Sequence, residues 1–215
     1  MARYPIQNRC IKRITKSIIM NFETFVNRKI KGTLSRWFGI QFQHPSETAK
    51  VRHWVLPYCV GKGCDIGFGG DKVKKVDCDG IDYPQPYAHA GKDKVDIPCD
   101  VIKDEIPVSD NTYDYVYSSH LIEDVPDTAQ VLQKFIRILK NGGNLILVFP
   151  NQEKYEAICN RIGQPLNPYH VHKDMGLEFM LQQLKRIPNI QTKLLFSSNC
   201  EIDYNVVMVL QIHKL

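Results

Sequence analysis

The chain has 215 residues, of which 43% are hydrophobic and 24% are charged. These proportions are typical of a folded globular protein, and this length can bury a core without disulfide support. They exclude collagen, coiled coil and disorder of the bulk of the chain. No apolar run exceeds five residues, whereas a membrane-spanning helix needs roughly 20. The N-terminus has no apolar stretch of the kind that a secretion signal carries, so we predict no signal peptide.

The cysteine pattern points to a reducing compartment. There are seven cysteines, an odd number, and no two have Cys-x-x-Cys spacing. The odd count argues against a disulfide framework, and the absence of this spacing argues against a structural zinc site. We therefore predict a cytoplasmic protein without a bound metal.

Positive charge is concentrated at the N-terminus. The chain has a net charge of +5, yet residues 1–50 carry ten basic against two acidic side chains, and residues 51–215 carry 18 against 21. Apolar residues between positions 14 and 30 recur every three or four residues, which predicts an amphipathic helix. We interpret residues 1–45 as a basic helical extension and residues 46–215 as the domain. The extension is a candidate contact for nucleic acid, a protein partner or a second copy, or simply a solvated face.

From residue 46 onward, strand and helix patterns alternate. Ser46 is placed to cap a first helix, and Asn141-Gly142-Gly143 to end a later one. Buried parallel strands alternating with helices predict an open, mainly parallel sheet covered on both faces. The last two strands are close in sequence and should pair antiparallel. The predicted strands are Gly63–Ile66, Val76–Asp82, Lys94–Asp100, Tyr113–Ser119, Leu145–Phe149, Lys193–Ser197 and Tyr204–His213, and the helices are Glu47–Leu56, Thr128–Lys140, one from Asn151 to Gly163 and one capped by Asp174.

A glycine turn and an acidic strand end suggest a nucleoside site. The turn Gly67-Phe68-Gly69-Gly70 follows the first strand, and Asp82 ends the next one, 17 residues after Asp65. Glycines let the backbone approach a ligand closely, and an acidic group at that strand end can accept both ribose hydroxyl protons. The dinucleotide pattern requires a further glycine where this chain has Lys72, which disfavours a nicotinamide-dependent oxidoreductase.

Five motifs, in order, resemble those of class I S-adenosylmethionine (SAM) dependent methyltransferases, above all the type 11 group. The resemblance spans about residues 46–150 and implies a Rossmann-like, seven-stranded, mostly parallel sheet with a C-terminal antiparallel hairpin, here with an N-terminal helical extension. Two features depart from the pattern: Asp124 stands where that group usually has His, and the crossover Asp71–Asp79 is too short for a full helix. The motifs are Asp65–Gly70, Ile81–Tyr83, Pro98–Val101, Tyr113–Val125, and Leu139–Gly143 with the strand after it.

The resemblance implies a SAM site at the carboxyl ends of the first four strands. The glycines would admit the methionine part of SAM, the first acidic residue would order the loop, and the acidic end of the second strand would bind the ribose. The acid after the third strand and the following N–H would bracket the adenine. The cofactor-binding residues predicted in this way are Asp65, Gly67, Gly69, Asp82, Tyr83, Asp100, Val101 and Ser118.

The acceptor side is less specified. A base is needed only if the acceptor loses a proton, and His120 and His170 are the candidates. We expect the segment from Asn151 to Asp174 to cover the acceptor, facing Ser118 and His120. A small metabolite or glycan precursor suits the type 11 resemblance, whereas RNA or another polyanion suits the basic extension. A catalytically inactive, methyltransferase-like partner subunit is the remaining alternative, because of Asp124.

Overall fold

The computed structural model describes residues 46–85 and 91–215, so the predicted extension over residues 1–45 lies outside the described residues. No helix in the described part is long and apolar enough to span a bilayer. The elements are α2 (Glu47–Val55), the 3-10 turn η1 (Leu56–Tyr58), β1 (Gly63–Ile66), β2 (Cys78–Asp82), β3 (Ile97–Pro98), β4 (Tyr113–Ser119), the 3-10 turn η2 (Ile122–Asp124), α3 (Thr128–Ile138), β5 (Leu139–Pro150), α4 (Gln152–Ile162), α5 (Leu177–Lys185), β6 (Ile190–Ile202) and β7 (Asn205–Lys214).

One seven-stranded sheet organises these residues, in the order β3-β2-β1-β4-β5-β7-β6. Neighbouring strands from β3 to β5 are parallel, and β7 is antiparallel to both β5 and β6. This confirms the predicted Rossmann-like sheet with its closing hairpin. The strand order reverses between β1 and β4, and open α/β sheets bind ligands outside the carboxyl ends of the strands at such a point.

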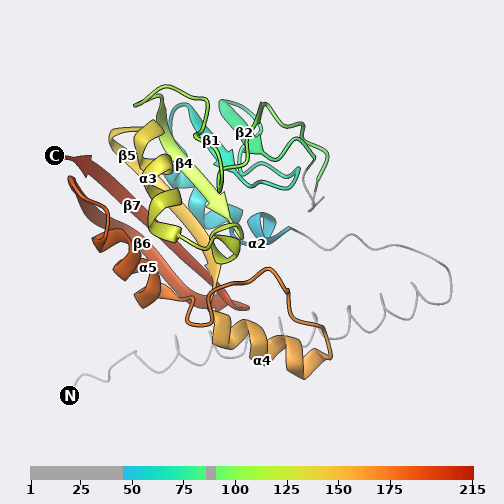
Figure 1. The fold of residues 1–215 in the computed structure, drawn as a ribbon. Helices are drawn as coiled ribbons and strands as arrows, with labels where there is room; N and C mark the ends of the chain where they lie inside the picture. The colour runs from blue at the N-terminus through green and yellow to red at the C-terminus, as the bar shows by residue number, and fades with distance from the viewer. Residues whose placement is uncertain (1–45, 86–90) are drawn as a thin grey trace, which may run out of the picture. The chain divides into compact units, whose positions relative to one another are not determined.

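The sheet separates two apolar cores. On one face, α3 and α5 pack on the sheet through Leu132, Phe135 and Met180, all fully buried. On the other face, α2 contributes Val51 and Val55. Figure 1 shows α3 and α5 on the same side of the sheet and α4 beyond the carboxyl end of β5. Because both faces of β5 are covered, its central residues form the continuous apolar run seen in the sequence.

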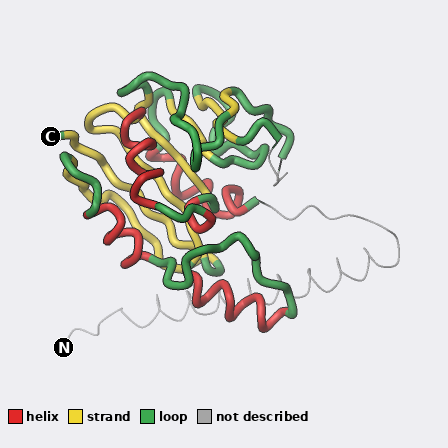
Figure 2. The backbone as a smooth tube through the Cα atoms, in the orientation of Figure 1, coloured by secondary structure: helices red, strands yellow, loops and turns green. Residues whose placement is uncertain are grey.

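Between β1 and β3, loops connect the strands. The described chain from 67 to 77 and from 91 to 96 contains no helix, as the short first crossover predicted, and Figure 2 shows loops around these strands. Side chains hold this region instead. Lys72 pairs with Asp96 at 2.8 Å, and Lys75 pairs with Asp71 at 3.0 Å and also with Asp93.

Several predicted boundaries are wrong. The strand predicted over Lys193–Ser197 extends from Ile190 to Ile202, and the strand predicted from Val76 begins at Cys78. The helix predicted to reach Lys140 ends at Ile138, and β5 begins at Leu139 because that residue pairs with Tyr113 on β4. The predicted cap Asp174 does not cap α5, whose N-cap is Gly176. The third strand is only two residues long, so the sheet holds the chain that follows it weakly.

Candidate active site

The glycine turn after β1 folds against the end of β2. Gly67, Gly69 and Gly70 have φ angles of +72°, +54° and +83°, in the left-handed region where side chains with a Cβ are strained. The Gly67 N–H donates to the Ile81 carbonyl at 2.8 Å, and the Gly69 N–H donates to the Asp82 carboxylate at 2.9 Å. The turn and the acidic strand end predicted to share a ligand are therefore in direct contact.

Asp65 holds the far end of the loop. It is fully buried in β1, and its Oδ2 accepts the Val73 N–H at 2.6 Å. Burial raises the pKa of this carboxyl well above its ordinary value, and the bond from Val73 opposes that rise. Its Oδ1 has no partner among the described residues. Leaving a buried polar atom without a hydrogen bond costs folding free energy. We therefore expect a further polar group to lie beside the loop and to bond to this oxygen.

The helix α2 also supports this loop, through contacts that no sequence motif predicts. The Arg52 guanidinium pairs with Asp71 at 2.7 Å and donates to the Val73 carbonyl at 3.2 Å. The Ser46 hydroxyl, which caps α2, also donates to Asp71. No local pattern announces these contacts, because α2 and the loop are separate segments.

Asp82 lies half-buried at the end of β2. Besides the bond from Gly69, its Oδ1 accepts the N–H of Tyr83 at 2.7 Å, and the Tyr83 side chain is exposed. A carboxylate at this end of the second strand is the group that accepts from ribose hydroxyls in open α/β sheets.

The predicted adenine segment follows β3 directly. The Asp100 Oδ1 accepts the N–H groups of Ile102 and Lys103, at 3.2 and 3.4 Å. Burial opposes ionisation of Asp100, but Lys103 outweighs it and lowers the pKa of the carboxyl. The Val101 N–H donates to no partner within residues 46–85 and 91–215. A carboxylate beside an unpaired N–H fits the amine and ring nitrogen of an adenine.

Ser118 is buried within β4, with its hydroxyl donating to the Ile66 carbonyl at 2.9 Å. It links β4 to β1 beneath the glycine turn. Its predicted contact with SAM stays a prediction.

His120 lies at the end of β4 and is enclosed by acceptors. Its Nδ1 is 2.8 Å from Glu123 Oε1, and its Nε2 is 2.6 Å from Asn205 Oδ1. The Asn205 amide nitrogen donates to Glu47 Oε2 at 2.9 Å, which fixes the amide with its oxygen toward His120. Burial opposes the charge, but Glu123 and Glu47 outweigh it and raise the pKa of His120 to about 9.

Two carboxylates complete this cluster. Burial opposes ionisation of Glu47, but His120 and Lys50 lower its pKa. Glu123 is 2% exposed, and its Oε2 has no partner among the described residues. Glu123 lies within the fourth motif, three residues after His120, and this spacing is the signal that could have identified it. Glu47 and Asn205 come from distant elements and left no such signal.

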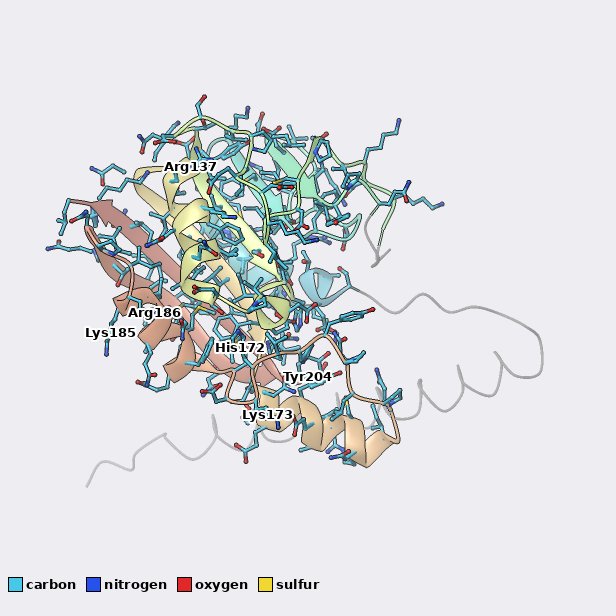
Figure 3. The ribbon with its side chains drawn as sticks, viewed as in Figure 1. Arg137, His172, Lys173, Lys185, Arg186 and Tyr204 are labelled. Atoms are coloured by element: carbon cyan, nitrogen blue, oxygen red, sulfur yellow. The ribbon has the colours of Figure 1, made fainter. Side chains whose placement is uncertain are left out.

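The segment after α4 reaches the cluster. The His170 Nδ1 donates to Gln152 Oε1 at 2.9 Å, and its Nε2 is 3.9 Å from Glu123 Oε1. The Gln152 amide nitrogen donates to Glu156 at 2.9 Å, which fixes its orientation. His172 lies 2.7 Å from the Val125 carbonyl, and Figure 3 shows it and Tyr204 near the start of α4. The predicted cover over the acceptor side therefore contacts η2 directly.

Comparison with known proteins identifies what this domain is similar to. Residues 65–147 match a family model described as "Methyltransferase domain". A probable S-adenosylmethionine-dependent methyltransferase of Mycolicibacterium smegmatis is 29% identical over 125 residues, or 54% of this chain and 47% of that protein. A demethylmenaquinone methyltransferase of Bacillus mycoides is 34% identical over 80 residues, 34% of each chain. The chain thus spans about half or less of these curated relatives.

Solved structures extend the likeness of the fold. A SAM dependent methyltransferase from Archaeoglobus fulgidus superposes with a TM-score of 0.55 at 16% identity, over 76% of this chain and 92% of that one. A putative methyltransferase of Haloferax volcanii, solved with the Trm112 methyltransferase activator, has a TM-score of 0.57 at 15% identity, over 86% and 96%.

Proposed function

We propose that the chain is a class I SAM-dependent methyltransferase, because residues 65–147 match a methyltransferase family model and the fold is similar to that of a SAM dependent methyltransferase. In this proposal it transfers a methyl group from SAM to an oxygen or nitrogen of a small metabolite or glycan precursor. Residues 46–215 form the methyltransferase domain in this proposal, and residues 1–45 form a separate extension. The protein acts in the cytoplasm.

The contact between Gly69 and Asp82 carries the proposal. It joins the glycine turn to the acidic end of β2 beside the point where the strand order reverses. Asp100 follows the next strand at the same edge of the sheet. Backbone N–H groups, a ribose-binding carboxylate and an adenine-binding carboxylate therefore line one edge, in the order that an extended nucleoside requires.

The chain's own residues bind and orient both reactants. When bound, SAM supplies a methyl group on a sulfonium, which a nucleophile attacks in line. Gly67 and Gly69 admit the methionine part, Asp65 anchors the loop through Val73, and Asp82 holds the ribose. Alignment of the two reactants alone accelerates the transfer strongly, since well-oriented intramolecular systems reach effective molarities of about 10⁵–10⁸ M.

His120 acts as a fixed cation, and His170 is the candidate base. Both ring nitrogens of His120 face acceptor oxygens, so the imidazolium has no lone pair to offer. His170 donates from Nδ1 to Gln152, which leaves Nε2 as the nitrogen that can accept a proton. His120 lowers the pKa of Glu47 at the edge where the acceptor must lie.

The basic residues of the extension favour a second arrangement, in which a polyanion such as RNA is the acceptor. Phosphate contacts release counterions, so binding of such an acceptor weakens steeply with salt. A small neutral acceptor shows little salt dependence. The extension also suits a protein partner or a second copy.

Calorimetric titration with SAM, with its product S-adenosylhomocysteine and with NAD tests the cofactor assignment. We expect Asp82→Ala to weaken SAM binding about ten- to hundredfold, since it removes a charge-assisted bond worth about 1.5–3 kcal/mol. Asp82→Asn keeps an acceptor for the Gly69 N–H and separates loss of charge from loss of the turn. Asp110→Ala, an exposed carboxylate paired with Arg137, is the matched control. Unchanged affinity in Asp82→Ala would refute the ribose assignment.

A further inference from the structure

Lys134 is a buried cation whose partners are main-chain oxygens. It lies in the middle of α3 and is 7% exposed. Its Nζ donates to the carbonyls of Val101, Ile102 and Asp104, at 3.1, 3.4 and 2.8 Å. A lysine ammonium has three N–H donors, and here each has an acceptor. Burial of a charge is tolerated only when its hydrogen bonds are made, so Lys134 and this turn constrain each other.

Asp100 holds the same turn from the opposite side. Its carboxylate accepts the N–H groups of Ile102 and Lys103, and its carbonyl accepts the Asp104 N–H at 2.7 Å. The N–H groups of the turn thus face Asp100, while its carbonyls face Lys134. The two-residue strand β3 gives the turn little support. Its conformation therefore depends on these two side chains.

We propose that Lys134 is a positioning residue for the nucleobase of the cofactor. This inference rests on the proposed function, in which Asp100 and the Val101 N–H bind the adenine. Lys134 acts through this turn, because its three N–H donors already have main-chain acceptors. It fixes the backbone that carries both adenine-binding groups, so that they are preorganised to read an amine and a ring nitrogen side by side.

Arg137 provides a matched control, one turn further along α3. Its guanidinium donates to the carbonyls of Val108 and Ile106 at 2.8 and 2.6 Å, so it also ties α3 to main-chain oxygens. It holds the chain beyond the adenine segment, and Figure 3 shows it far from the start of α4. Replacing it removes a comparable support without touching the turn after Asp100.

The experiment measures base discrimination in the full chain. S-adenosylhomocysteine and S-inosylhomocysteine, which has a carbonyl in place of the adenine amine, are titrated into the wild type, Lys134→Met and Arg137→Met. We expect Lys134→Met to weaken S-adenosylhomocysteine binding about three- to tenfold, which is the usual range for the loss of one hydrogen bond, here between the turn and the adenine. The ratio of its affinities for S-adenosylhomocysteine and S-inosylhomocysteine should fall, because binding groups that are not held in place discriminate poorly between the two bases. Arg137→Met should lower the melting temperature and leave the preference unchanged.

The outcomes distinguish a failure of the proposed function from a failure of the role of Lys134. A wild type that binds neither nucleoside refutes the proposed function and this inference with it. A wild type with a clear preference, retained in full by Lys134→Met, makes Lys134 a purely structural residue and overturns the inference alone. If Lys134→Met does not fold, Lys134→Gln, which keeps two N–H donors, should show an intermediate preference; a full preference in that variant also contradicts the inference.

Discussion

The charge on His120 ties the stability of the fold to pH. The side chain is 16% exposed and lies 2.8 Å from Glu123 and 3.9 Å from Glu47. Burial opposes its charge, but these carboxylates raise its pKa from 6.5 to about 9. A pKa that is higher in the folded state stabilises that state at low pH. The contribution is complete below about pH 6.5 and is lost as the pH rises through about 9.

The size of the effect follows from the pKa difference. The rise from 6.5 to about 9, at about 1.4 kcal/mol for each pH unit, corresponds to about 3 kcal/mol of unfolding free energy. Buried cysteines complicate the same range, because burial raises the thiol pKa of Cys59 to about 12 and that of Cys78 to about 11. Unfolded thiols ionise near pH 8.5, so every variant loses stability above that pH. The contribution of His120 is therefore the difference between wild type and variant in how the unfolding free energy changes with pH.

The test is the double substitution His120→Asn with Glu123→Gln, which removes both charges and leaves neither buried and unpaired. Asn tolerates the φ of +52° at position 120. Urea unfolding under reducing conditions, followed by tryptophan fluorescence, gives the unfolding free energy from pH 6 to 9.5. The wild type should lose about 3 kcal/mol more than the double variant over this range. His213→Gln, an exposed control, should follow the wild type. Equal losses in wild type and double variant would refute the ion pair.

Two further predictions concern the core and the domain boundary. Phe135→Ala removes a fully buried ring between α3 and the sheet and should cost about 3–5 kcal/mol in urea unfolding, whereas the exposed Gln133→Ala should change it by less than about 0.5 kcal/mol. A chain that starts at Ser46 keeps the α2 cap and both cores. Circular dichroism and calorimetry should show that it folds and binds S-adenosylhomocysteine as the full chain does. Failure to fold would place residues 1–45 in the fold.

Local patterns were enough to predict much of the architecture. β1 and β4 have the predicted bounds, because each is a buried run closed by a turn. Asn151 caps α4, and Gly163 ends it in the left-handed conformation, as the local residue types indicated. The acidic ends of the early strands could also be placed at one edge, since parallel strands present their carboxyl ends together.

Contacts between distant segments set the rest. Asn141-Gly142-Gly143 has the composition of a helix stop, yet it lies within β5, because pairing of Leu139 with β4 outweighs the local preference. The surroundings of His120 are set for a similar reason. Its pKa is raised first by Glu123, which is close in sequence, but also by Glu47 and Asn205, which are 158 residues apart in the chain and meet only after the sheet has formed. Hydrogen bonding and burial across such separations shift a pKa without leaving a periodic trace in the sequence, so the effect of Glu47 and Asn205 on the pKa of His120 follows only from the folded arrangement.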